Sequence, residues 1–259
     1  MRPTATRTGR ALLGLGAVLT LWEVTSRAGL VSSRYLSPPT LVAARLGQLM
    51  TDASFLADAV STALSWAIAV LCATVIGVGG GLLVGSVPVL RALLTPVVEL
   101  LRPLPSVALI PLAVVVLGSG AQVKITVAAF AATWPVLINT VHGLHTVDPV
   151  HADTARVFRV PRIQVVWAVT LPAIAPAVLT GIRLATSVAV IVVVGTEFLA
   201  GGTIGLGEFA YLQGSAAGRM DLVLATTVLV TVANLAVDLA LLALQRRFMP
   251  WIERTELSA

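Results

Sequence analysis

The stretch VSTALSWAIAVLCATVIGVGGGLLV, residues 60–84, decides the fold class of this chain. Its 25 residues include no charged side chain. A helix needs about 20 consecutive apolar residues to cross the hydrocarbon core of a bilayer. A soluble helix of this length would instead present a polar face to water. Residues 60–84 are therefore predicted to form a transmembrane helix.

Other apolar stretches on both sides of this segment have a similar composition. Of the 259 residues, 57% are hydrophobic and only 11% are charged, whereas a soluble domain carries about a quarter charged residues. The chain is therefore predicted to be an all-α membrane protein with about six transmembrane helices. The expected spans are residues 11–25, 60–84, 105–117, 123–141, 177–199 and 222–244.

The arginines indicate how these helices cross the membrane. Segments on the predicted side of the N-terminus hold eleven arginines, and segments on the opposite side hold four, with Lys124 expected at a membrane edge. Because positive side chains accumulate on the cytoplasmic side, both termini of a bacterial inner-membrane protein are expected there. The net charge of +5 does not indicate nucleic-acid binding, since the arginines are scattered at the ends of apolar blocks.

Four sections of the chain are expected. Residues 1–30 hold a tail and the first span, 31–58 an outer loop, 59–248 the membrane core with a cytoplasmic loop at 144–175, and 249–259 a cytoplasmic tail. In the outer loop, Thr40 is expected to cap a helix that lies on the membrane surface. The predicted apolar face of that helix consists of Leu41, Ala44, Leu46 and Leu49.

The cytoplasmic loop contains VDPVHADTARVFRVPRIQVVWAVTLPAIAP, residues 147–176. Asp148-Pro149 is typical of a helix start, with the aspartate as cap and the proline in the first turn. Val160-Pro161 ends this short helix, because a proline disfavours helical backbone at the residue before it. Val157 and Phe158 lie on its apolar face, so either the protein's own helices or a soluble partner must cover them.

This segment resembles the Glu-Ala-Ala loop of ABC importer permeases. Asp153-Thr154-Ala155 stands in the Glu-Ala-Ala place, Arg159 in the place of the family glycine, and Leu171-Pro172 in the Leu-Pro place. The resemblance covers roughly residues 35–251 and is closest to the sulfonate, taurine and nitrate branch. Further matching stretches are residues 102–105, 110–112, 135–140, 147–149, 179–183 and 205–207.

The resemblance implies a type I (MetI-like) permease fold in which residues 149–160 form a coupling helix on a separate ATPase. The implied coupling residues are Asp153, Thr154, Ala155, Val157, Phe158, Arg159, Leu171 and Pro172. The resemblance also implies three kinds of protein partner: ABC ATPase subunits, an extracytoplasmic solute-binding protein and a second copy of the permease. Membrane lipid is expected to surround the helices. The implied cargo is a small anionic solute such as a sulfonate, taurine or nitrate. The chain departs from relatives at Arg159, Asp153, Ser65 and Val188; relatives often have arginine at the last two positions.

Polar residues inside predicted spans are candidates for the transport pathway, because charges in a bilayer are costly. Arg183, Glu197 and Asn139 are the candidates here. Arg183 is expected either to meet an anionic solute or, preferably, to reach towards the inner membrane surface. Glu197 is expected near the outer end, as a gate or a contact between permeases. The two charges are 14 residues apart, about 21 Å along a helix, so they cannot pair.

Several kinds of site are not expected. Lys124 is the only lysine and follows Val123, so no phosphate-binding Gly-Lys motif exists, and the chain is not expected to be an enzyme or to bind ATP. No metal site is expected, and the histidines at 142, 145 and 151 are assigned to the membrane surface. The glycines between 77 and 85 predict a packed helix interface, and those at 201–207 a tight turn. A secondary transporter, or a membrane scaffold without an ATPase partner, remains the alternative.

Overall fold

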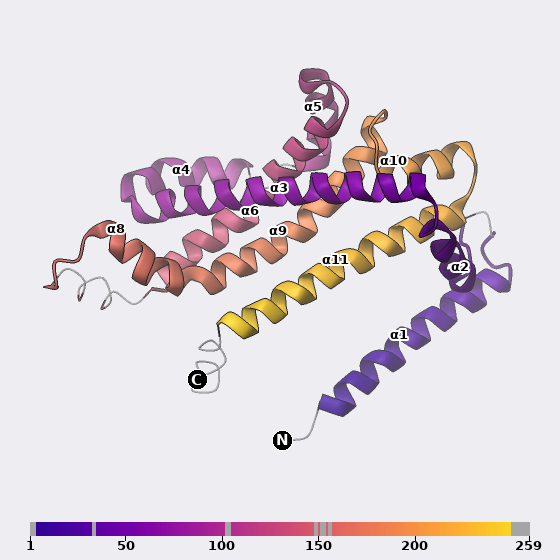
Figure 1. Cartoon of the computed structure of the whole chain (residues 1–259), viewed down its shortest axis with the longest axis horizontal. Coiled ribbons are helices and arrows are strands. Elements are labelled where there is room, and N and C mark those ends of the chain that lie inside the picture. The colour runs from indigo at the N-terminus through magenta and orange to yellow at the C-terminus, as the bar shows by residue number, and fades with distance from the viewer. Residues whose placement is uncertain are drawn as a thin grey trace.

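The computed structural model describes residues 4–32, 35–101, 105–147, 150, 154 and 157–249. These residues form helices joined by short connections, and no strand occurs among them (Figure 1). The helices are α1 (Thr4–Arg27), α2 (Pro39–Leu49), α3 (Ala53–Ser86), α4 (Pro88–Leu101), η1 (Ser106–Leu109), α5 (Ile110–Leu117), α6 (Ala121–His145), α8 (Arg162–Val165), η2 (Val166–Thr170), α9 (Leu171–Ala200), α10 (Leu206–Tyr211), η3 (Leu212–Ala216) and α11 (Met220–Phe248).

Four of the described helices are long and apolar enough to cross a membrane. They cover Ala53–Ser86, Ala121–His145, Val166–Ala200 and Met220–Phe248. Pro88–Leu101 and Ser106–Leu117 together would make a fifth span, but they meet at an angle of 84°. The apolar part of α1 that was predicted to span, residues 11–25, is only about 22 Å long as a helix. The total of six spans therefore stays a prediction for α1 and for the bent pair.

The core of the molecule is a bundle of α3, α6 and α9. Small side chains line its centre, among them Ala73 on α3, Ala132 on α6, and Ala185 and Ala189 on α9, all of which are buried. Because lipid is as apolar as the side chains themselves, helices in a membrane associate mainly through close packing. Several bulky apolar residues in the middle of α3 are exposed instead, as Leu71 and Val75 are.

Glycines allow α3 to approach α6 closely. A Cβ atom on Gly77 would lie 2.6 Å from Cβ of Val136, and a Cβ atom on Gly81 would lie 2.6 Å from Cβ of Thr140. Residues 77 and 81 are one helical turn apart, so both lie on the face of α3 that meets α6. The packed interface that the glycine run predicts is confirmed at these positions.

The bundle has two distinct ends. Figure 1 shows α8 towards one end of the molecule and α2 and α10 towards the other, with the last turn of α11 on the side of α8. We call these the α8 end and the α10 end.

Two predicted boundaries were wrong. The predicted connection at 86–103 is largely helical, because α4 occupies Pro88–Leu101. Helix α9 begins at Leu171 and continues through Pro176, six residues before the predicted start of the span at residue 177. A proline at position 172 favours this early start, since its fixed φ suits the first turn of a helix.

The predicted helix of the outer loop is α2, but its details differ. It begins at Pro39 after Pro38, so Thr40 lies inside the helix and does not cap it. Its buried residues are Val42 and Leu49, with Leu46 packed beside them, whereas Leu41 and Ala44 are exposed. The buried face is set by α11, against which α2 packs, and Arg45 of α2 bonds Asp221 of α11 at 2.8 Å.

Candidate functional site

A buried ion pair joins three helices at the α10 end. Lys124 lies in the first turn of α6 and Glu197 in the last turn of α9, with side chains only 1% and 0% exposed. Nζ of Lys124 donates to Oε1 of Glu197 at 2.7 Å, to Oγ of Ser61 at 3.1 Å and to the carbonyl oxygen of Ile204 at 2.8 Å. All three donors of the ammonium group are therefore used.

The carboxylate of Glu197 is equally well satisfied. The hydroxyl of Thr62 donates to it from α3 at 2.9 Å, and the backbone N–H of Gly207 donates to Oε2 at 3.0 Å. Oγ1 of Thr62 in turn accepts from the backbone N–H of Leu206 at 2.9 Å. This network connects α3, α6 and α9 to the loop before α10, and we call it the Lys124–Glu197 cluster. A buried ion pair is tolerated when its remaining donors and acceptors are satisfied in this way.

The cluster also explains the sequence Gly205-Leu206-Gly207. A Cβ atom at residue 205 would lie 2.2 Å from Oε1 of Glu197. A Cβ atom at residue 207 would lie 2.2 Å from the carbonyl oxygen of Val194. The predicted tight turn is present, with positive φ at Gly201 and Gly202. Sequence reasoning missed Lys124, which was placed at a membrane edge, although a single lysine at the start of an apolar helix was a usable signal.

A second ion pair joins α9 to α11. Nε and Nη2 of Arg183 donate to the two carboxylate oxygens of Asp238 at 2.8 and 2.9 Å. This paired geometry is the strong form of an arginine–carboxylate contact. From the sequence, Arg183 was expected to meet an anionic solute or to reach towards the inner membrane surface. The structure instead provides a carboxylate 55 positions away, so the charge of Arg183 is compensated within the chain.

The third pathway candidate, Asn139, lines a separate hollow of about 330 Å³ between α6, α9 and η1. Its Nδ2 donates to the carbonyl oxygen of Pro135 at 2.8 Å. The indole N–H of Trp134, which also lines the hollow, is buried and has no hydrogen-bond partner among the described residues. Val188 lines it as well. Arg183, Glu197 and Asn139 thus lie in three different places and do not form one site.

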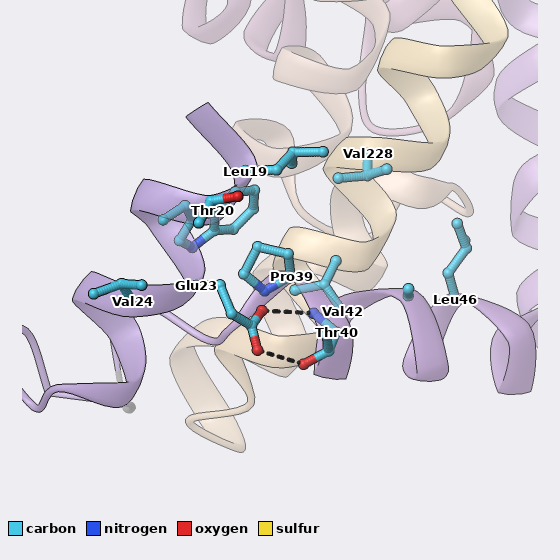
Figure 2. A pocket seen from close by; sticks show the side chains of 11 residues that line it. Leu19, Thr20, Glu23, Val24, Pro39, Thr40, Val42, Leu46 and Val228 are labelled. Atoms are coloured by element: carbon cyan, nitrogen blue, oxygen red, sulfur yellow. Dashed lines mark hydrogen bonds between the residues drawn. The ribbon is translucent and has the colours of Figure 1, made fainter. Parts of the chain in front are cut away.

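Another hollow, of about 580 Å³, lies between α1, α2 and α11 (Figure 2). Its walls are almost wholly apolar, except for Glu23 and the polar side chains near it. Glu23 accepts hydrogen bonds from the backbone N–H of Thr40 at 3.2 Å and from its hydroxyl at 2.9 Å. Glu23 therefore joins α1 to the first turn of α2. These hydrogen bonds satisfy its carboxylate in a hollow whose other walls are mainly apolar.

The predicted coupling segment lies between α6 and α9 at the α8 end. Asp153 and Ala155 are outside the described residues. Val157 and Phe158 are 79% and 75% exposed, and the backbone N–H of Phe158 donates to the carbonyl oxygen of Thr154 at 3.1 Å, as in a helix. Leu171 and Pro172 form the first turn of α9. Two bulky apolar side chains therefore face outwards at this end.

Arg159 ends the coupling segment with a φ of 52°, a positive value that non-glycine residues rarely adopt. The family glycine falls at this position, so the backbone keeps the conformation that glycine favours although the side chain differs. The left-handed conformation costs a residue with a Cβ atom about 1–2 kcal/mol.

We expect Arg159→Gly to make the turn at 157–160 more resistant to opening than Arg159→Ala does, because only glycine removes the Cβ atom. Hydrogen exchange of the backbone amides near this turn measures the difference. Both variants remove the charge, so their comparison isolates the backbone. Equal exchange in the two variants would show that the positive φ carries no strain.

Known proteins resemble this chain over most of its length. Residues 73–250 match the family described as binding-protein-dependent transport system inner membrane component. The taurine transport system permease protein TauC of Escherichia coli (strain K12) is 32% identical over 242 residues, which is 92% of this chain and 87% of that protein. The bicarbonate transport system permease protein CmpB of Synechococcus elongatus is 31% identical, over 70% of this chain and 62% of that protein.

The fold is similar to that of a chain of the inward-facing MetNI methionine ABC transporter. The TM-score is 0.63 at 19% identity, with 72% of this chain and 92% of that chain covered. The predicted type I permease fold is confirmed by this likeness. Subunits of this kind have no ATPase site of their own, so the chain is not an enzyme. With its apolar helices and this similarity, the chain belongs to the family of inner-membrane permease components of binding-protein-dependent ABC importers.

Proposed function

We propose that this chain conducts a small anionic solute across the membrane and is driven by a separate ATPase that docks on residues 149–160. A solute-binding protein delivers the solute at the α10 end, and two copies of the chain enclose the pathway. Both chain termini lie on the cytoplasmic side, together with the docked ATPase. The taurine and bicarbonate relatives support an anionic cargo, because each of those solutes carries an anionic group.

The observation that carries the ATPase proposal is the exposure of Val157 and Phe158. Exposed apolar residues that lie together on a surface commonly mark a protein interface. These two lie in the chain between α6 and α8, outside the helices that are long and apolar enough to cross a membrane. An ATPase groove that covered them would transmit its movement directly to α9 through Leu171 and Pro172, which begin that helix.

The hollow at Asn139 is the best candidate for a stretch of the pathway. It lies beside two central helices, and it combines the apolar Phe130 and Leu184 with the polar Ser106 and Asn139. The free N–H of Trp134 is a hydrogen-bond donor without a charge, which suits an anion that must bind and then leave. Arg183 and Glu197 then act as ties that hold the surrounding helices, since each already has a partner of opposite charge.

Phe158→Ala is expected to weaken the association with the ATPase by roughly 30-fold, the effect of about 2 kcal/mol lost at a central aromatic contact. The tagged chain is extracted gently from its native membrane, and the proteins that co-purify are identified and quantified by mass spectrometry. Phe248→Ala is the matched control, because Phe248 is an exposed phenylalanine at the end of α11 and lies outside residues 149–160. Normal recovery of the ATPase with Phe158→Ala would refute the coupling assignment.

A further inference from the structure

A hollow of about 370 Å³ lies at the α10 end, outside the Lys124–Glu197 cluster. Asp58 of α3 and Glu208 of α10 line it, together with the loop residues Gly202, Thr203 and Ile204. We call it the acidic hollow. Its residues differ from those of the coupling segment and of the hollow at Asn139, and the proposed transport cycle assigns them no role.

The charges of the acidic hollow are not compensated within the described part of the chain. Neither Asp58 nor Glu208 forms a salt bridge there. The cation of the cluster, Lys124, pairs with Glu197 and gives its other two donors to Ser61 and Ile204. Oε1 of Glu208 accepts a single hydrogen bond, from the backbone N–H of Gly202 at 3.1 Å. Two partly buried carboxylates beside each other without a cation attract a positive charge.

Thr203 provides an independent indication of a ligand. The residue is only 2% exposed and lines the acidic hollow. Its hydroxyl oxygen is buried and has no hydrogen-bond partner among the described residues. A buried polar group left unpaired costs about 1–3 kcal/mol, so an occupant that bonds this hydroxyl would recover that free energy.

The surroundings favour a protein side chain over a metal ion. Ca²⁺ takes six to eight oxygen ligands, whereas this hollow offers two carboxylates, and the described residues contain no group of three or more His, Cys, Asp or Glu that could hold a metal. Ile204 and Leu212 also line the hollow and are 69% and 50% exposed. Exposed apolar residues next to a charged pocket are typical of a protein interface.

We propose that the acidic hollow receives a lysine or arginine side chain of the solute-binding protein when that protein docks. This inference rests on the proposed function, because that function places the binding protein at the α10 end. The cation bonds Asp58 and Glu208 and meets the hydroxyl of Thr203, while Ile204 packs against the same partner. The contact orients the binding protein over the loop that the Lys124–Glu197 cluster holds in place.

The test uses the complete transporter, with its co-purified ATPase, in lipid nanodiscs. Affinity for the solute-binding protein that serves this transporter is measured for the wild type and for the double variant Asp58→Asn/Glu208→Gln. We expect the double variant to bind about tenfold more weakly, with a slower association rate, because complementary charge mainly accelerates encounter. The affinity of the wild type should fall as salt is raised, and that of the double variant should change little.

Asp52→Asn is the matched control. Asp52 also lies at this end and caps α3 outside the hollow, where a side-chain hydrogen bond from Ser54 holds its pKa below the usual range. The substitution therefore removes a real charge, and asparagine can still cap the helix. Binding by Asp52→Asn should equal that of the wild type. A basic-to-acidic change in the binding protein that restores affinity to Glu208→Lys would identify the residue that enters the hollow.

Three results would overturn the proposal in different ways. Unchanged affinity in the double variant, with the ATPase still bound, refutes the acidic hollow alone. Stabilisation of the wild type by Ca²⁺ that the double variant lacks, with normal binding-protein affinity, shows a metal site instead. A wild-type preparation that contains no ATPase under any gentle extraction refutes the proposed function, and this inference with it.

Discussion

Lys124→Met is expected to lower the free energy of unfolding by about 3–5 kcal/mol. The change leaves the carboxylate of Glu197 fully buried without a counter-charge. It also frees the carbonyl oxygen of Ile204 and the hydroxyl of Ser61, which both accept from Nζ. Denaturation of the purified chain in detergent, followed by circular dichroism, measures the loss.

A double variant separates loss of the pair from loss of packing. In Lys124→Met/Glu197→Leu no charge stays buried, so much of the lost stability should return, because a buried ion pair contributes little net stability relative to apolar side chains. The N–H groups of Leu206 and Gly207 lie next to the cluster, so the loop before α10 should remain looser than in the wild type. A double variant that is less stable than Lys124→Met would contradict the assignment of the cost to the unpaired carboxylate.

The second large effect is expected from Gly81→Ala, which should destabilise the bundle by about 1–3 kcal/mol. The added Cβ atom would lie 2.6 Å from Cβ of Thr140 and 3.0 Å from the carbonyl oxygen of Leu137. Thr140 is fully buried, and its hydroxyl donates to the carbonyl oxygen of Val136, so its side chain has no free space to enter. Helix α3 must then move away from α6, and the melting temperature of the purified chain should fall.

Gly79→Ala is the control for this effect. Residue 79 lies in the same helix, but a Cβ atom there would meet nothing within 4 Å. Alanine is the better helix former by about 1 kcal/mol, so Gly79→Ala should be neutral or stabilising. A similar loss of stability in both variants would indicate that the glycines act through backbone flexibility and not through the contact between α3 and α6.

The two sites lie in different parts of one bundle. The contact at Gly81 lies nearer the α8 end of α3, whereas Thr62 and Lys124 lie at the α10 end. Since the sites are separated and share no partner, the two destabilising effects should add within about 0.5 kcal/mol. Strong coupling between them would mean that α3 and α6 move as one rigid unit when either contact is lost.

The spans could be predicted from sequence for a simple physical reason. A backbone in lipid must satisfy its own hydrogen bonds, so a long uncharged stretch such as residues 60–84 has one available structure, a helix. The same reasoning predicted the helices at 123–141 and 222–244. It failed where the chain is not a straight span, at residues 86–117, because local hydropathy does not show that two short helices meet at 84°.

The partners of the charged residues could not be predicted. Arg183 pairs with Asp238, 55 positions away, and Lys124 pairs with Glu197, 73 positions away. The sequence showed that such charges need an explanation, because they are costly in a membrane. It did not show which helices are neighbours. The sequence therefore predicted a membrane-edge position for Lys124, and a solute or the membrane surface as the partner of Arg183.

By itself, the sequence determined that the chain is a helical membrane protein. It also determined that the chain carries the permease-like motifs in their order, and that it contains no phosphate-binding Gly-Lys motif. Each of these depends only on residues that are close together along the chain. The tertiary structure alone decided which face of α2 is buried, why Gly205 and Gly207 must lack side chains, and which carboxylates keep their charges compensated. These features depend on distances between segments far apart in sequence, and such distances are set by the packing of α3, α6, α9 and α11.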